Sequence, residues 1–321
     1  MRWVKRAAWG CGTILVLIVA AGIALWVWRP WVPPVEMTAP GATGRRVTIA
    51  GWPANFYPAP RPGRQPAILL LGGSEGGLGA GVSAMARALQ GHGYAVLNPS
   101  YFRAPGQSRA LVRVPLEGFA SALAWLRAQP GVDPERIAII GGSKGAEAAL
   151  VIASRTPGLR AVVAGMPSSV VWPGFAWEAT PVVGSSWTAG GRDVPSLPYG
   201  QGSFSEGIIS VYRRGLENMA AHPDAAIAIE RSPAPVLLIC GEKDSLWPSC
   251  RMARQLAARD PRVTLLSYAD AGHGVFGPPL TADNPRRARL GTLGGSPEGN
   301  NAARQNGWPK VLAFLDRTLA K

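Results

Sequence analysis

The sequence predicts one α/β domain, in which helices cover both faces of a mostly parallel sheet. Two observations lead to this prediction. Apolar, β-branched runs of strand length alternate with helix-like stretches over most of the chain, which is the pattern of a parallel sheet. The chain has 321 residues, of which 47% are hydrophobic, enough for the core of one such domain. Its 40 glycines and 30 prolines are spread along the chain, as expected for turns between packed elements.

The N-terminus has a different character from the rest of the chain. Residues 7–28 read AAWGCGTILVLIVAAGIALWVW and contain no charge. As a helix, this run is long enough to cross a bilayer core of roughly 30 Å. Arg2, Lys5 and Arg6 precede this run, and tryptophans lie at both of its ends. The run continues into Trp-Val-Trp-Arg-Pro, which offers no signal peptidase site. We therefore predict a transmembrane anchor over residues 1–28, with a cleaved signal peptide as the alternative.

Residues 29–44 are rich in proline and are predicted to form an extended, poorly packed tether, after which the folded domain covers residues 45–321. Strands are expected at 47–50, 67–71, 94–98, 136–140, 161–165, 236–240 and 263–268. Helices are expected at 82–89, 116–128, 144–154, 250–258 and 308–319.

Residues 166–235 break this alternation of strands and helices. They are rich in Gly, Pro, Ser and aromatic residues and contain one helix-like piece at 208–219. Because a long irregular insertion in a compact domain is usually functional, we interpret it as a lid, with a surface excursion as the alternative.

The pattern Gly-x-Ser-x-Gly occurs twice, around Ser74 and around Ser143. A nucleophilic serine needs a sharp turn between a strand and a helix, with the helix N-terminus facing the reacting centre. Ser143 follows the apolar run RIAII and precedes KGAEAALVIAS, which is rich in helix formers. Ser74 is followed by EGGLGAG, which is too rich in glycine to start a helix promptly. The sequence therefore predicts an α/β-hydrolase fold with Ser143 as nucleophile and the loop around Ser74 as the oxyanion loop.

The serine hydroxyl is a weak nucleophile and needs a base. The chain contains three histidines. His273 follows the last predicted strand, where the chain order Ser…Asp…His of this fold has its base. His92 is interpreted as a turn residue and His222 as an exposed residue. His273 is therefore the predicted base.

The base must in turn be oriented by a carboxylate. Asp244 comes directly after a predicted strand and ahead of His273, so it is the predicted acid, with Glu242 as the fallback. Asp270 is too near His273 in sequence to come from a separate strand end.

The oxyanion of the reaction is expected to bind the backbone N–H of Lys144 and one N–H from Gly73 or Ser74. Lys144 is also predicted to pair with Glu147 at i,i+3, with contact to an anionic substrate as the alternative. No metal and no cofactor are predicted, since Cys and His do not cluster.

Beyond these residues, the chain from about residue 67 to its C-terminus resembles the acyl-CoA thioesterase / bile acid-CoA:amino acid N-acyltransferase C-terminal domain family. The segments that carry the resemblance are VPLE (114–117), GSKGAE (142–147), SWT (186–188), LP (197–198), APVLL (234–238), D…WPS (244–249), AGH (271–273), and GG (294–295) with Trp308. The resemblance implies cleavage of acyl thioesters, typically fatty acyl-CoA, by a Ser-Asp-His enzyme. Members that transfer acyl groups to amino acids use Cys as the nucleophile, so Ser143 favours hydrolysis.

Three other functions stay open at this point. They are an acyltransferase on the same residues, a dienelactone-hydrolase-like esterase, and a membrane-tethered binding protein on an inactive fold. The inactive binding protein is disfavoured, because the predicted nucleophile, acid and base (Ser143, Asp244 and His273) are all present. The acyl-chain length, the choice between thioester and oxygen ester, and the oligomeric state are not determined by the sequence.

The net charge of the chain and the distribution of its cations predict its binding partners and its location in the cell. The formal net charge is +14, which suits an anionic lipid surface or substrate, with solvated arginines of no binding role as the alternative. No nucleic-acid-binding pattern accompanies the charge. Three of the cations precede the apolar run, whereas Arg29 is the only one between that run and Arg45. This asymmetry predicts a single pass through the plasma membrane with the domain outside, in the periplasm of a Gram-negative host. Acyl-CoA is kept in the cytoplasm, so either the orientation is wrong or the substrate is an ester or thioester at the outer face.

The chain has three cysteines, and Cys240 and Cys250 are close in sequence beside the predicted acid. A disulfide between them is possible in an oxidising compartment, and buried free thiols at a strand end are the alternative.

Overall fold

The computed structural model describes the backbone of residues 2–178 and 181–320, and the side chains from residue 14 onward within these ranges. The strands of its main sheet are β1 (Arg45–Ile49), β2 (Trp52–Tyr57), β3 (Gln65–Leu71), β4 (Ala95–Pro99), β6 (Val132–Gly142), β7 (Ala161–Gly165), β10 (Val236–Gly241) and β11 (Val263–Tyr268). The helices are α1 (Arg2–Trp28), α2 (Ala80–Gly91), α3 (Leu116–Arg127), α4 (Lys144–Ala153), α5 (Ile209–Glu217), α6 (Ser249–Arg259) and α7 (Pro297–Thr318).

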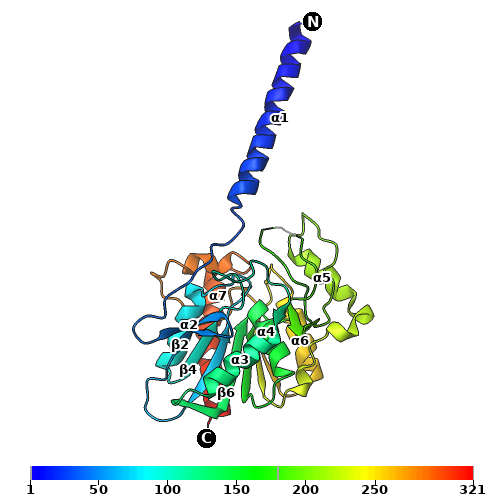
Figure 1. Ribbon diagram of the computed structural model, residues 1–321. Coiled ribbons are helices and arrows are strands. Elements are labelled where there is room, and N and C mark those ends of the chain that lie inside the picture. Colours follow the sequence, from blue (N-terminus) through cyan, green and yellow to red (C-terminus); the bar gives the residue numbers. More distant parts are fainter. Residues whose placement is uncertain (1, 179–180, 321) are drawn as a thin grey trace.

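The main sheet has eight strands in the order β1-β2-β4-β3-β6-β7-β10-β11 (Figure 1). All neighbours from β4 to β11 are parallel, and β2 pairs antiparallel with both β1 and β4. The prediction of a mostly parallel sheet is confirmed.

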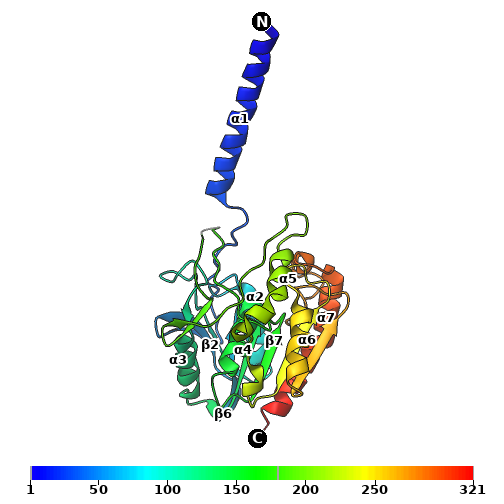
Figure 2. The same ribbon diagram turned by 90° about the vertical axis from the view of Figure 1, so that its right-hand side faces the viewer.

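Alternation along the strands divides the core into two layers. Leu69 and Leu71 of β3 belong to the cluster that contains buried residues of α3, α4 and α6, whereas Ile68 and Leu70 belong to the cluster that contains those of α2 and α7. Successive side chains of a strand point to opposite faces, so a sheet buried on both sides needs apolar residues at every position. Helices therefore cover both faces of the sheet (Figures 1 and 2).

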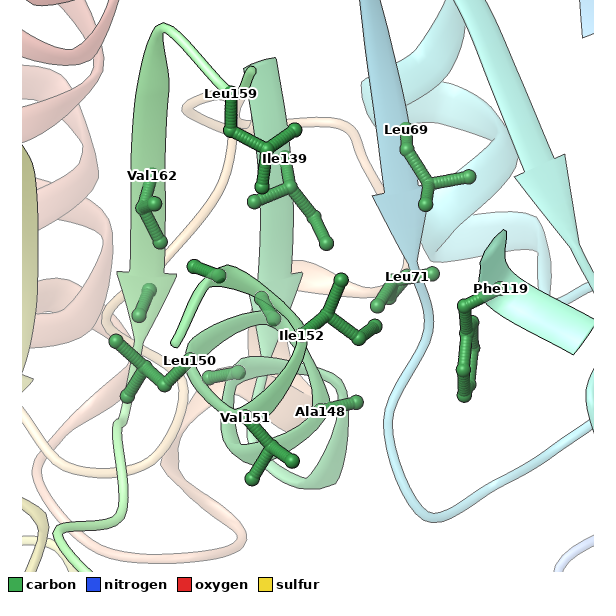
Figure 3. Packing of buried hydrophobic residues seen from close by; sticks show 14 of the residues in the cluster. Leu69, Leu71, Phe119, Ile139, Ala148, Leu150, Val151, Ile152, Leu159 and Val162 are labelled. Atoms are coloured by element: carbon green, nitrogen blue, oxygen red, sulfur yellow. The ribbon is translucent and has the colours of Figure 1, made fainter. Parts of the chain in front are cut away.

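Helix α4 lies at the centre of one of these layers. Figure 3 shows its Leu150 and Ile152 packed toward Ile139 of β6, Val162 of β7 and the two leucines of β3. Every residue of α4 is buried. The second half of this helix, ALVIA, is apolar all round and can be accommodated only in the interior, so the charged residues of the first turn are buried as well.

The predicted strands and helices recur with shifted ends, and two further differences have a clear physical reason. Strand β2 was not among the predicted strands, because Pro53 interrupts its apolar run; the structure has this proline near the start of the strand, where the missing N–H is tolerated. Helix α7 begins at Pro297 rather than at residue 308, since Ser296 caps it by accepting a hydrogen bond from Gly299 N–H. Pro309 lies inside this helix.

The insertion 166–235 holds α5, part of a small sheet and short helical turns. The small sheet consists of β5 (Val114–Pro115), β8 (Trp187–Ala189) and β9 (Arg192–Asp193). Single-turn helices lie at Met219–Ala221, Pro223–Ala225 and Ile229–Arg231, and a fourth short helix, outside the insertion, is at Arg287–Gly291. Trp172 and Leu216 of the insertion pack with Trp247 and Met252 of the α6 region in a separate cluster. The insertion is thus fixed to the side of the sheet that carries α4 and α6.

The Pro-rich segment after α1 makes specific contacts with the loop that follows β3. Leu78 N–H donates to Glu36 O at 2.7 Å, and Thr38 N–H donates to Leu78 O at 2.9 Å. The Glu36 carboxylate accepts the Ala80 N–H at the start of α2 at 2.6 Å. Residues 36–38 therefore lie against the domain, so part of the expected tether is packed.

Helix α1 extends away from the sheet domain, and its side chains are exposed over residues 14–28 (Figure 1). Within the part of the chain that the structure describes, no helix combines the length and the hydropathy that crossing a membrane requires.

Truncation of the α4 layer should have a large energetic cost. Leu150→Ala should lower the free energy of unfolding by about 2–5 kcal/mol, because the cavity forms in a fully enclosed site. Val183→Ala, at a side chain 82% exposed, should change it by less than about 0.5 kcal/mol. Urea denaturation of both variants measures the difference, and equal effects would contradict the assigned packing.

Candidate active site

Ser143 lies between β6 and α4 in a backbone conformation that side chains rarely adopt. Its φ is 55° and its ψ is −122°. The Ser143 N–H donates to Gly165 O of β7 at 2.9 Å, and its carbonyl accepts from the N–H groups of Ala146 and Glu147. The chain thus turns sharply from strand to helix at this residue, as the sequence predicts for a nucleophile.

The glycines that flank Ser143 are required by close backbone contacts. A Cβ at Gly141 would lie 2.0 Å from Gly145 O, and a Cβ at Gly145 would lie 2.3 Å from Gly72 O. Helix α4 can therefore approach both its own strand and the end of β3 only because these positions lack a side chain. This approach brings the loop after β3 next to Ser143.

The structure brings Ser143, His273 and Asp244 together in one chain of hydrogen bonds. The His273 Nε2 atom lies 3.0 Å from Ser143 Oγ, and the Nδ1 atom lies 2.9 Å from Asp244 Oδ2. The three residues follow β6, β10 and β11, so they meet at the carboxyl edge of the parallel strands. The histidine and aspartate side chains are almost completely buried.

Further donors fix the Asp244 carboxylate. Its Oδ1 accepts the N–H groups of Leu246 and Trp247, at 3.0 and 3.3 Å. Its Oδ2 also accepts the Ser249 hydroxyl at 2.7 Å. These hydrogen bonds fix the orientation of the carboxylate beside the imidazole. Ser249 is a site residue that the motif WPS contains but whose role the sequence did not reveal.

The loop that carries His273 is held by the start of α7. Asn300 accepts the Gly272 N–H at 2.9 Å and donates to Gly294 O and Ser296 O. A Cβ at Gly294 would lie 1.9 Å from Lys243 O, in the loop of the predicted acid. Asn300 could not be found in the sequence, because a single asparagine in a polar stretch gives no signal.

Three side chains hold the carbonyl groups of the loop around Ser74. The Tyr101 hydroxyl donates to Gly72 O at 2.6 Å, and burial raises the pKa of this tyrosine well above its usual value, so the group stays a donor. Trp177 Nε1 donates to Ser74 O at 2.6 Å, and Arg103 Nη1 donates to Glu75 O at 2.7 Å.

Lys144 and Glu147 form a buried ion pair on the first turn of α4. Lys144 Nζ lies 2.8 and 2.9 Å from the two carboxylate oxygens. Burial lowers the pKa of the Lys144 amine and raises the pKa of the Glu147 carboxyl, and the opposite charge of each partner counteracts both shifts. The same carboxylate accepts from Trp187 Nε1 at 2.8 Å and from Trp172 N–H at 3.2 Å, both in the insertion. The predicted i,i+3 pair is confirmed, and it joins the helix to the insertion.

The histidine and carboxylate alternatives lie elsewhere. His92 pairs with Asp316 at 3.2 Å, and His222 ends a single-turn helix of the insertion. Asp270 pairs with Lys243 and Glu242 with Arg254.

Cys240 and Cys250 form a disulfide that connects the end of β10 to the start of α6. The bond therefore closes the loop that carries Asp244. Their sulfurs and a Glu242 oxygen lie within 4.8 Å of one another, but disulfide sulfurs are not the thiolates that bind metals.

The comparisons with known proteins give the family of the chain. The family model described as "BAAT / Acyl-CoA thioester hydrolase C terminal" matches residues 114–321. The chain belongs to this family. Acyl-coenzyme A thioesterase 2, mitochondrial, of Rattus norvegicus is 27% identical over 296 residues, which cover 88% of this chain and 62% of the rat protein. Acyl-coenzyme A thioesterase 1 of Homo sapiens is 27% identical over 314 residues, which cover 91% of this chain and 68% of the human protein. The chain thus spans about three fifths of the length of the rat relative.

Solved structures share the fold at lower identity. An esterase of Pyrobaculum calidifontis is similar with a TM-score of 0.52 and 20% identity, covering 90% of this chain and 88% of the esterase. A dienelactone hydrolase-like phosphotriesterase from metagenomic libraries gives a TM-score of 0.55 and 17% identity, covering 86% of this chain and 98% of that protein. The α/β-hydrolase fold predicted from the serine motif is confirmed.

Removing only one member of the buried ion pair should be costly. Lys144→Met should lower the free energy of unfolding by about 3–5 kcal/mol, because it leaves the Glu147 carboxylate buried without its partner. The double variant Lys144→Met/Glu147→Gln removes both charges and keeps an acceptor for Trp187, so it should be more stable than the single variant. Urea denaturation compares the two, and a double variant less stable than the single one would contradict this account.

The disulfide can be tested chemically. Peptides that contain Cys240 and Cys250 should be alkylated only after reduction of the denatured protein, and mass spectrometry should find them linked beforehand. Two alkylated thiols in the native, unreduced protein would contradict the bond.

Proposed function

We propose that this protein is a serine hydrolase that cleaves acyl thioesters or esters through an acyl-enzyme intermediate. The observation that carries the proposal is the chain of hydrogen bonds from Ser143 through His273 to Asp244. In this proposal Ser143 Oγ attacks the acyl carbonyl while His273 takes its proton and later returns it to the leaving group. Asp244 keeps the imidazole in the required tautomer and stabilises its cation.

The oxyanion that forms in this reaction needs donors close to Ser143. Lys144 begins α4, and an N–H group of the first helical turn has no partner within the helix. A second donor comes from the N–H of Gly73 or Ser74 in the neighbouring loop. Such donors typically contribute about 10²–10³ in turnover each. Water then attacks the acyl-enzyme with His273 as base, which completes hydrolysis.

The substrate class follows from the family and from the charges of the site. The named relatives are acyl-coenzyme A thioesterases, so an acyl group on a thioester or an ester is the proposed substrate. The buried Lys144 amine donates to both carboxylate oxygens of Glu147, so we do not assign it to an anionic leaving group.

We further propose that α1 anchors the chain in the plasma membrane, with the catalytic domain on the outer side. The exposed apolar side chains of residues 14–28, the uncharged run 7–28 and the preceding cations support this proposal. The Cys240–Cys250 disulfide supports an oxidising compartment. On this basis the substrate is an acyl ester or thioester met at the outer face rather than cytoplasmic acyl-CoA.

Substitution of the three proposed catalytic residues should abolish turnover. Ser143→Ala and His273→Ala should fall to near background, and Asp244→Asn should lose about 10⁴ because the wrong tautomer is favoured. Hydrolysis of an acyl-CoA series and a nitrophenyl ester series by the full chain in detergent measures the effects and ranks the two substrate types.

Matched substitutions outside the proposed triad are the controls. His92→Ala and His222→Ala should stay within a few-fold of the wild type, and Ser74→Ala should remain active because its backbone N–H survives. An active His273→Ala variant, or inactivity of Ser74→Ala alone, would contradict the assignment.

The orientation can be tested with reporters fused after Lys321. Alkaline phosphatase should be active, because that enzyme needs an oxidising compartment, and green fluorescent protein exported in the same way should be dark. Fluorescence with a silent phosphatase would overturn the orientation and would restore acyl-CoA as the leading substrate.

A further inference from the structure

One of the two backbone N–H groups expected to bind the oxyanion already donates a hydrogen bond to a side chain of the protein. The Gly73 N–H donates to Glu75 Oε1 at 3.2 Å. A Cβ at Gly73 would lie 3.5 Å from Ser143 Cβ and 2.8 Å from Glu75 Oε2, so both carboxylate oxygens are near the residue that adjoins the nucleophile. A side chain of the protein thus occupies a donor that the reaction is expected to use.

The loop backbone is held so that this donor keeps its direction. The N–H and C=O of a trans peptide point in opposite directions, and Tyr101 holds Gly72 O from the side away from the Gly73 N–H. Trp177 and Arg103 hold the carbonyls of Ser74 and Glu75. The backbone is thus held at three carbonyls of this loop, whereas the acceptor of the Gly73 N–H belongs to a flexible side chain.

Within the described residues, the Glu75 carboxylate forms no salt bridge. Arg103 approaches Glu75 but donates to its backbone carbonyl. The residue is also only partly buried, so the side chain can leave toward solvent. A carboxylate and a developing oxyanion cannot share one N–H, because both are negative acceptors.

We propose that Glu75 is a displaceable internal ligand of the oxyanion site. Its carboxylate holds the Gly73 N–H in the free enzyme and leaves when the carbonyl oxygen of the substrate takes its place. Glu75 thereby sets the rate at which Ser143 is acylated, and it opposes the binding of acyl groups that carry a negative charge beside the carbonyl. This inference rests on the proposed function, since it requires Ser143 to be the nucleophile.

The test compares the rate of Ser143 labelling by an uncharged fluorophosphonate in the full-length chain. Glu75→Ala removes the ligand, and Glu75→Gln removes its charge while keeping its shape. Each should raise the second-order rate constant of labelling by at least about threefold, since a charge-assisted hydrogen bond that must be broken contributes more than a neutral one. Glu135→Gln, an exposed site on β6, should label at the wild-type rate.

A purely structural role for Glu75 gives the opposite result. If the carboxylate only shapes the loop, its loss lowers the rate of labelling, and an unchanged or lower rate in a variant that melts like the wild type overturns the proposal. Should Glu75→Ala fail to fold, the rate of the isosteric Glu75→Gln variant decides. If the wild type itself is not labelled, the proposed function fails, and that outcome is distinct from unaltered labelling of the variants.

Discussion

The placement of the His273 imidazole between Ser143 Oγ and Asp244 Oδ2 is the interaction on which the rest of this structure depends. It requires loops after three different strands to meet at one edge of the sheet. The sheet order brings β6, β7, β10 and β11 side by side, and glycines such as Gly145 and Gly294 let the backbones of the loops approach one another. The unusual φ of Ser143 persists because the buried helix α4 and the hydrogen bond to β7 over-determine it.

Much of the fold is predictable from the sequence, because buried parallel strands and amphipathic or apolar helices leave clear patterns. Residues 67–71 and 161–165 are examples, since each is an unbroken apolar run that the structure places within a strand buried on both faces. Strand β2 escaped prediction because Pro53 is normally a sign against a strand. The start of α7 escaped it because a polar first half carries no apolar periodicity, and only the Ser296 cap marks it.

Sequence reasoning found the proposed catalytic residues but not the residues that position them. Ser143, Asp244 and His273 stand out through motif and chain order, and the structure places them within hydrogen-bonding distance. The roles of Asn300 and Tyr101 depend on contacts between segments far apart in the chain, which no local pattern encodes. The contact between Glu75 and Gly73 could not be predicted for another reason. A loop rich in glycine suggests backbone N–H groups without partners, and only the structure shows that the Gly73 N–H donates to the Glu75 carboxylate.

Mapping the covalent adduct of the intact protein with a fluorophosphonate tests the central claim most directly. The account predicts one adduct per chain, located by tandem mass spectrometry on Ser143, and no adduct after His273→Ala because the hydroxyl then lacks its base. An adduct on Ser74, or an unchanged adduct on Ser143 in the absence of His273, would contradict the assignment of these residues to one catalytic unit.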